Sequence, residues 1–179
     1  MSDVETLFVI NSKRGSYILE DMLAMIAWSA RGSSYMTIVV DETGTISRLS
    51  APGRLRIMHS DLPAHAPSGF HRAAGLKQVA LNDLVFRRVI MLSDTCLLTT
   101  QSVDTFFADH IQKENIGLIG VRSQADNERV WQQSANALLQ WKLPVHEWER
   151  PPISLCDDFL VLSPRFIEAM ARQDLLLPA

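Results

Sequence analysis

The chain alternates short, continuous apolar runs with longer segments in which apolar residues recur at helical spacing. The runs are rich in Val, Ile and Leu and end in Gly, Pro, Asn, Asp or Ser, a pattern typical of strands buried on both faces. The longer segments repeat apolar residues every three or four positions, which indicates one buried helix face. The expected strands cover residues 7–10, 35–40, 55–58, 89–92, 116–121 and 159–162.

Helix signals stand between most of these runs. Ser16 can cap a helix that ends at Arg31-Gly32, and Ser163-Pro164 suits the start of a final helix, because Ser caps well and Pro fits the first turn. Further helices are expected around residues 73–80, 103–111 and 131–138. Strands that alternate with helices predict an α/β fold, a three-layer sandwich with a mostly parallel sheet. Without repeats or linker signatures, we expect residues 1–179 to form a single domain.

Composition narrows the class of protein. The 179 residues are 47% hydrophobic and 21% charged, with a net charge of -3, and no basic run is present, so we expect no nucleic-acid partner. Cys96 and Cys156 sit among apolar residues and are expected to be small core residues in a reducing compartment. We expect no secretory signal and no transmembrane segment, because the longest apolar stretch falls short of the roughly 20 residues that span a bilayer. These features predict a cytoplasmic protein.

Polar residues follow four of the expected strands, where open α/β sheets bind ligands. Polar residues at a single strand end are also typical of a turn. Lys13-Arg14, which follows the first expected strand, is either a solvated loop or a phosphate contact. The usual phosphate and nucleophile motifs GxGxxG, GxxxxGK[ST] and GxSxG are missing from the sequence. The four polar groups are Asn11-Ser12, Asp41-Glu42, His59-Ser60-Asp61 and Ser93-Asp94-Thr95.

Three segments in order carry a family resemblance: VVDETG at 39–44, RAAGLKQV at 72–79 and VIMLSDT at 89–95. They resemble the "VVDDGS", "ARNxG" and "DxD" segments of inverting GT-A glycosyltransferases, which are nucleotide-diphospho-sugar transferases. The resemblance covers about residues 5–125, the nucleotide-sugar-binding half. It implies that about 126–179 form a short acceptor-side half.

The resemblance assigns roles by position. Asp41 matches the carboxylate that binds the base or ribose, Arg72 matches the Arg near the diphosphate, and Asp94 matches one DxD carboxylate. Asn11 and Ser93 are expected to line the same nucleotide site. In that family the DxD pair holds Mg²⁺ or Mn²⁺ against the diphosphate, so a divalent metal at Asp94 is implied. The donor would be a nucleoside diphosphate sugar, with the acceptor and the oligomeric state open.

The chain also departs from that pattern. Ser93-Asp94-Thr95 carries one carboxylate where the family has two, and Ala73 replaces the Asn of "ARNxG". The family needs a general base for the acceptor hydroxyl, and Asp157-Asp158 is the candidate. Adjacent strand residues face opposite ways, so one of the two would serve, unless the pair is only an acidic turn.

Three hypotheses follow. The first is a glycosyltransferase that transfers sugar from the donor to an acceptor hydroxyl. The second is a non-catalytic binding or assembly module of the same fold, favoured by the missing carboxylate. The third is a nucleotidyltransferase-like enzyme, for which Ser12-Lys13-Arg14-Gly15 gives a faint basic loop. His71 beside Arg72 is a further candidate phosphate contact near a helix start.

Overall fold

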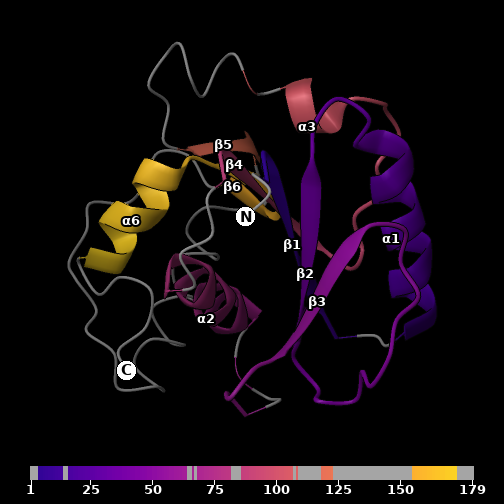
Figure 1. Cartoon of the computed structure of the whole chain (residues 1–179). Coiled ribbons are helices and arrows are strands. Elements are labelled where there is room, and N and C mark those ends of the chain that lie inside the picture. The colour runs from indigo at the N-terminus through magenta and orange to yellow at the C-terminus, as the bar shows by residue number, and fades with distance from the viewer. Residues whose placement is uncertain are drawn as a thin grey trace. The chain divides into compact units, whose positions relative to one another are not determined.

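A computed structural model describes residues 4–13, 16–63, 66, 68–81, 86–106, 108, 118–122 and 155–172 (Figure 1). The chain divides into two compact units, residues 1–119 with 157–179, and residues 120–156. The elements are β1 Thr6–Ser12, α1 Ser16–Ser29, β2 Tyr35–Asp41, β3 Arg54–His59, α2 Ser68–Leu81, β4 Arg88–Ser93, α3 Val103–Phe106, β5 Leu118–Arg122, β6 Leu155–Leu162 and α6 Pro164–Arg172.

The strands form one six-stranded sheet in the order β3-β2-β1-β4-β6-β5. Strands β1 to β4 are parallel to one another, and β6 runs antiparallel to β4. The central strands β1 and β4 are buried along their whole length because helices cover both faces, as their unbroken apolar runs require. All four parallel strands therefore end at the same edge of the sheet, which we call the carboxyl edge.

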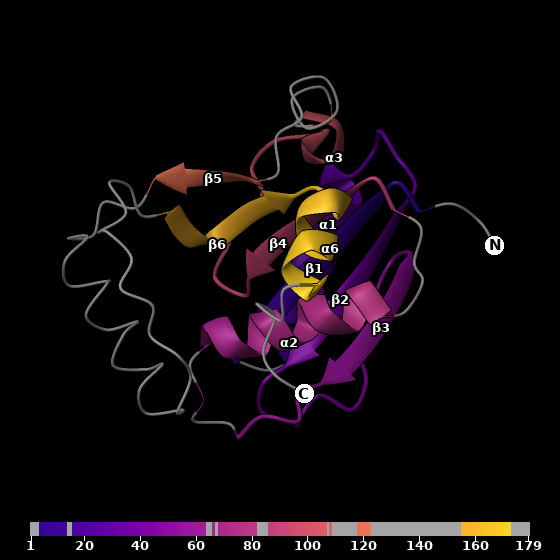
Figure 2. The same cartoon turned by 90° about the vertical axis from the view of Figure 1, so that its left-hand side faces the viewer.

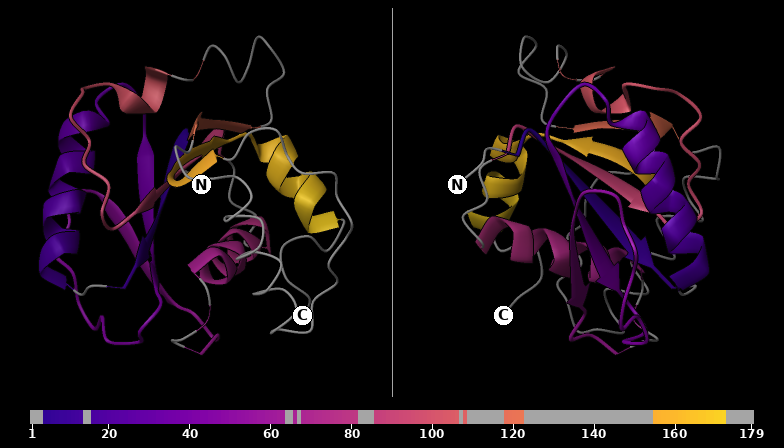
Figure 3. Two further views of the ribbon diagram at one scale, coloured as in Figure 1. Left: turned by 180° about the vertical axis from the view of Figure 1, so that it is seen from behind. Right: turned by 45° about the vertical axis from the view of Figure 1, so that its right-hand side comes forward.

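Helix α1 packs on one face of the sheet. Leu19, Leu23 and Ile26 of this helix form a core with the even-numbered positions of β1, such as Phe8 and Ile10. The other face carries α2 and α6, whose Leu76 and Ile167 join a second core with the odd-numbered positions of β1. Figure 3 shows the sheet between α1 on one side and α2 with α6 on the other, and Figure 2 views the α2 and α6 face. Strand alternation thus divides each strand's side chains between two cores.

Close approach of α2 to the sheet depends on a glycine. A Cβ built at Gly75 would lie 2.7 Å from Val40 Cγ2 on β2. Real Cβ atoms essentially never come this near a heavy atom, so a larger residue would push the helix from the sheet. This contact fixes α2 over β2, and with it the residues at the start of α2.

The predicted α/β fold with a mostly parallel sheet between helical layers is confirmed. The helix expected around 131–138 and the side chain of Cys156 lie outside the described residues. Across the ranges that the structure describes, no helix has the length and apolar character needed to cross a membrane.

Candidate functional site

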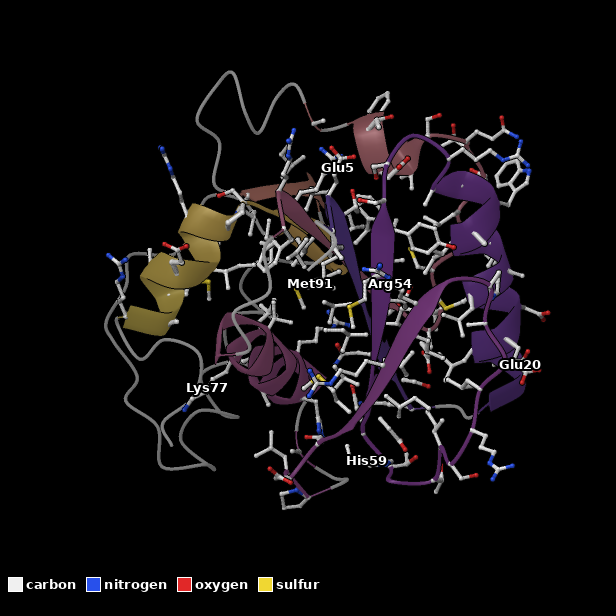
Figure 4. All side chains as sticks on the ribbon, in the orientation of Figure 1. Glu5, Glu20, Arg54, His59, Lys77 and Met91 are labelled. Atoms are coloured by element: carbon white, nitrogen blue, oxygen red, sulfur yellow. The ribbon has the colours of Figure 1, made fainter. Side chains whose placement is uncertain are left out.

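The carboxyl edge brings together polar residues that are far apart in the sequence. Ser12 at the end of β1 pairs with Asp41 at the end of β2, and Asn11 pairs with Ser93 of β4. Backbone bonding continues past the strands, since Glu42 N donates to Ser12 O and Asp94 N donates to Asn11 O. Figure 4 labels His59, which marks the carboxyl end of β3, and Arg54 at the opposite end. The polar strand ends predicted as a site are therefore neighbours in space.

Asp41 is buried and fully engaged by its own loop. Its Oδ1 accepts hydrogen bonds from Thr43 N at 3.0 Å, Thr43 Oγ1 at 2.9 Å and Gly44 N at 3.0 Å. Its Oδ2 accepts from Ile46 N at 2.7 Å and lies 3.3 Å from His59 Nδ1. Burial raises the pKa of Asp41, but the hydrogen bonds from residues 43–46 outweigh it and lower that pKa. Because the Asp41 carboxylate is 0% exposed and accepts these hydrogen bonds, it organises the loop after β2.

Glu42, one residue on, belongs to a different cluster. Its side chain is 2% exposed, and its Oε1 accepts a hydrogen bond from Asn11 Nδ2 at 3.0 Å. Its Oε2 lies 3.6 Å from Lys13 Nζ, whose side chain is 51% exposed. Within the described part of the chain, Glu42 Oε2 and Asn11 Oδ1 are buried without a hydrogen-bond partner. Glu42 and Asn11 thus retain acceptor capacity beneath a half-exposed lysine.

His71, in the second turn of α2, contacts the same region of the edge. Its Nδ1 lies 2.7 Å from Ser60 Oγ, just past the end of β3. Burial lowers the pKa of His71, and the charge of Lys13 lowers it further, while the charge of Glu42 opposes this shift. The ring is therefore neutral near pH 7. Arg72 follows it and is also buried.

Asp94 connects β4 to the loop after β1. Its Oδ2 accepts hydrogen bonds from Lys13 N at 2.8 Å and from Ser12 Oγ at 3.2 Å. The flanking hydroxyls of Ser93 and Thr95 bond to each other. Asp94 is buried, so this carboxylate fixes the backbone from which the Lys13 side chain extends.

The donor set at Asp94 fits a divalent cation poorly. Mg²⁺ and Mn²⁺ prefer several carboxylate, phosphate or water oxygens. Here there is one carboxylate, and its Oδ2 already accepts hydrogen bonds from two protein donors, Ser12 Oγ and Lys13 N. Among the side chains that the structure describes, no three His, Cys, Asp or Glu gather in a way that could hold a metal ion.

The strand β6 carries the two candidate base residues to this edge. Its antiparallel register pairs Leu92 of β4 with Phe159, the residue that follows Asp158 in β6. The backbone of Asp157 and Asp158 is therefore beside the end of β4, while their side chains lie outside what the structure describes.

From the sequence, Glu42 and Ser12 were placed only within the polar strand ends, without a role of their own, and Lys13 was left as either a solvated loop residue or a phosphate contact. Strand alternation could have separated Glu42 from Asp41, because Asp41 shares a face with Val39 and Glu42 shares one with Val40. The sequence Asp41-Glu42-Thr43-Gly44 is also typical of a loop closed by the Asp side chain. No sequence signal indicates that Lys13 reaches Glu42, since that contact depends on the path of the loop.

A second buried polar group lies at the opposite edge of the sheet. Asp104 Oδ2 accepts hydrogen bonds from Gly32 N at 3.1 Å and Ser33 Oγ at 2.7 Å. Arg88 Nε donates a hydrogen bond to Thr6 Oγ1 at 2.8 Å. Burial lowers the pKa of Arg88, and the charge of Asp104 partly offsets this lowering. This amino edge joins the start of β2 and β4 to α3.

Comparisons with known proteins support the fold. No protein-family model and no curated protein matches the sequence. A solved structure that does match is the mannosyltransferase PcManGT from Pyrobaculum calidifontis in complex with GDP-Man and Mn²⁺, at 9% identity and a TM-score of 0.57. The match covers 94% of this chain and 47% of that one, so this chain spans about half its length. At this identity the likeness shows that the two chains share a fold and nothing finer.

Proposed function

We propose that this chain binds a nucleoside diphosphate sugar at the carboxyl edge and transfers the sugar to an acceptor hydroxyl. The observation that carries the proposal is the convergence of buried polar side chains from β1, β2, β4 and α2 at the edge where α/β sheets bind ligands. The mannosyltransferase of similar fold was solved with GDP-Man, which supports this class of donor.

The residues divide the work by chemistry. Asn11 and Glu42 offer acceptors to the N–H and hydroxyl groups of the nucleoside, and Asp41 holds the adjoining loop. The cations Lys13 and Arg72 are the candidates for the diphosphate. Ser93, the last residue of β4, and Asp94, which binds Ser12 Oγ and Lys13 N, complete the proposed site.

Transfer would need a base next to the acceptor. In this proposal Asp157 or Asp158 takes the proton of the acceptor hydroxyl as its oxygen attacks the anomeric carbon. The bond to the diphosphate breaks, and its electron pair leaves with the nucleoside diphosphate. Inversion at the anomeric carbon is what the family resemblance implies.

A non-catalytic binding module is the second candidate. It is favoured by the single carboxylate at Ser93-Asp94-Thr95, which is already engaged by Ser12 and Lys13. Donor binding without release of nucleoside diphosphate would support this alternative.

The test is thermal unfolding with UDP-, GDP-, CMP- and dTDP-sugars, each with and without Mn²⁺. A ligand that binds only the folded state stabilises it by about 2.7 kcal/mol at a hundredfold excess over Kd. We expect one nucleotide class to raise the unfolding temperature, and no shift with any sugar nucleotide would refute the proposal. Release of nucleoside diphosphate in the presence of mixed acceptors, reduced in Asp157→Asn or Asp158→Asn, would then separate the enzyme from the module.

A further inference from the structure

Lys13 places a cation at the carboxyl edge, where the proposed function puts the diphosphate of the ligand. Its backbone N–H is held by Asp94 Oδ2 at 2.8 Å, and its ammonium reaches Glu42 Oε2 at 3.6 Å. The root of the side chain is thus fixed between β1 and β4, while the side chain itself is half exposed. A lysine anchored in this way can turn its ammonium between two partners at little cost in backbone order.

The pair that Lys13 makes with Glu42 leaves hydrogen-bonding capacity unused. The 3.6 Å separation exceeds the usual N–H···O range, and Glu42 Oε2 is buried with no hydrogen-bond donor among the described residues. Asn11 Nδ2 binds the other Glu42 oxygen, Oε1. Oδ1 of the same Asn11 side chain is also buried with no hydrogen-bond donor among the described residues. Buried acceptors without donors are unfavourable, so a ligand that supplies donors here gains binding energy.

Asp94 then has a role other than metal ligation. Its Oδ2 bonds to Lys13 N and Ser12 Oγ, which position the lysine. A chain that uses an ammonium for the diphosphate has no need of a second carboxylate at Ser93 or Thr95. The loss of the DxD pair and the lysine beside Asp94 are therefore parts of one arrangement.

We propose that this chain binds the diphosphate of its ligand without a divalent metal, using the Lys13 ammonium, positioned by Asp94, as the counter-charge. On binding, the ammonium turns from Glu42 to the diphosphate and uncovers the acceptors of Glu42 and Asn11 for the nucleoside. The proposal rests on the proposed function, because it concerns the same ligand. Inorganic Mn²⁺ would then add little to affinity.

Calorimetric titration of UDP, GDP and dTDP into the full chain, in EDTA and in Mn²⁺, tests this directly. For the nucleotide that binds, we expect Kd values in the two buffers within about threefold, since the lysine supplies the charge. Lys13→Met should weaken binding in EDTA about ten- to a hundredfold, the loss expected for a hydrogen bond to a charged group. Lys13→Arg should restore most of the affinity. Lys77→Met is the matched control, because Lys77 lies on α2 and points away from the sheet (Figure 4).

Asp94→Asn separates positioning from general stability. If Asp94 acts through Lys13, Asp94→Asn weakens binding in the wild-type background and has little further effect in Lys13→Met. Equal losses in both backgrounds would contradict this role. Binding that appears only with Mn²⁺, and that Lys13→Met leaves unchanged, would overturn the inference while leaving the proposed function intact. Absence of binding in both buffers would overturn both.

Discussion

The different roles of the adjacent carboxylates Asp41 and Glu42 give a sharp prediction about stability. Asp41→Asn keeps one side-chain oxygen for the donors of Thr43 and Gly44, which are exposed and can also bind water. Its amide nitrogen cannot accept the hydrogen bond from Ile46 N, now made to Asp41 Oδ2 at 2.7 Å. Since Ile46 is buried, its N–H loses its partner where water does not reach.

The expected loss follows from that one buried donor and the lost charge. An unsatisfied buried donor costs about 1–3 kcal/mol, and hydrogen bonds to a charged group contribute about 1.5–3 kcal/mol. We therefore expect Asp41→Asn to lower the free energy of unfolding by about 2–3 kcal/mol at pH 7. Glu42→Gln is the matched control, and it should change stability by less than about 1 kcal/mol, because its ion pair is to a half-exposed lysine.

Urea denaturation at several pH values measures both effects. The hydrogen bonds from residues 43–46 hold the pKa of folded Asp41 below its unfolded value. Its ionisation therefore adds stability above the unfolded pKa of about 3.9, and this is lost as the pH falls through the folded pKa. The difference between wild type and Asp41→Asn should shrink below about pH 4. An Asp41→Asn protein within about 0.5 kcal/mol of wild type at pH 7 would refute the assignment of Asp41 as the organiser of this loop.

Two further predictions concern α2. Burial holds the pKa of His71 in the folded protein below the ordinary 6.5. As the pH drops, His71 is therefore protonated in the unfolded chain before it is protonated in the folded one. The free energy of unfolding should then fall as the pH drops from about 6.5 towards the folded pKa. Urea unfolding between pH 8 and pH 5 checks this, and an equal slope in His71→Asn would contradict it. Gly75→Ala should lower the free energy of unfolding by about 1–3 kcal/mol, because the new Cβ would lie 2.7 Å from Val40 Cγ2. In the double variant with Val40→Ala, the loss in the free energy of unfolding should be smaller than the sum of the two single losses. Strictly additive losses would show that the strain of Gly75→Ala does not come from Val40.

The strands could be predicted from the sequence because each central one is a continuous apolar run. Residues 7–10 and 89–92 were expected, and β1 and β4 extend beyond them into Asn11-Ser12 and Ser93. The extension follows from pairing, since Asn11 and Ser12 continue the ladder with Val40 and Asp41. Apolar pattern marks the buried part of a strand, whereas its polar ends are fixed by the neighbouring strands.

The site was predicted in outline and not in detail. The polar strand ends were expected to meet because parallel strands end at one edge. The sequence predicts a nucleoside contact for Asp41, and this stays a prediction. Our proposal adds Glu42, because Asp41 Oδ2 accepts a hydrogen bond from Ile46 N and Ile46 belongs to the core. The Lys13 to Glu42 contact depends on a loop held by Asp94, which is 81 residues away in the sequence. Such a contact follows from tertiary structure alone.

Backbone amide chemical shifts, recorded during titration with the sugar nucleotide that stabilises the protein, show where the ligand binds. We predict that the largest changes fall at the carboxyl edge, at Asn11, Lys13, Glu42, His71 and Asp94, while the amides of Arg88 and Asp104 at the amino edge stay unchanged. Changes centred on the amino edge, or saturating binding that leaves the amides of Lys13 and Glu42 unmoved, would contradict it.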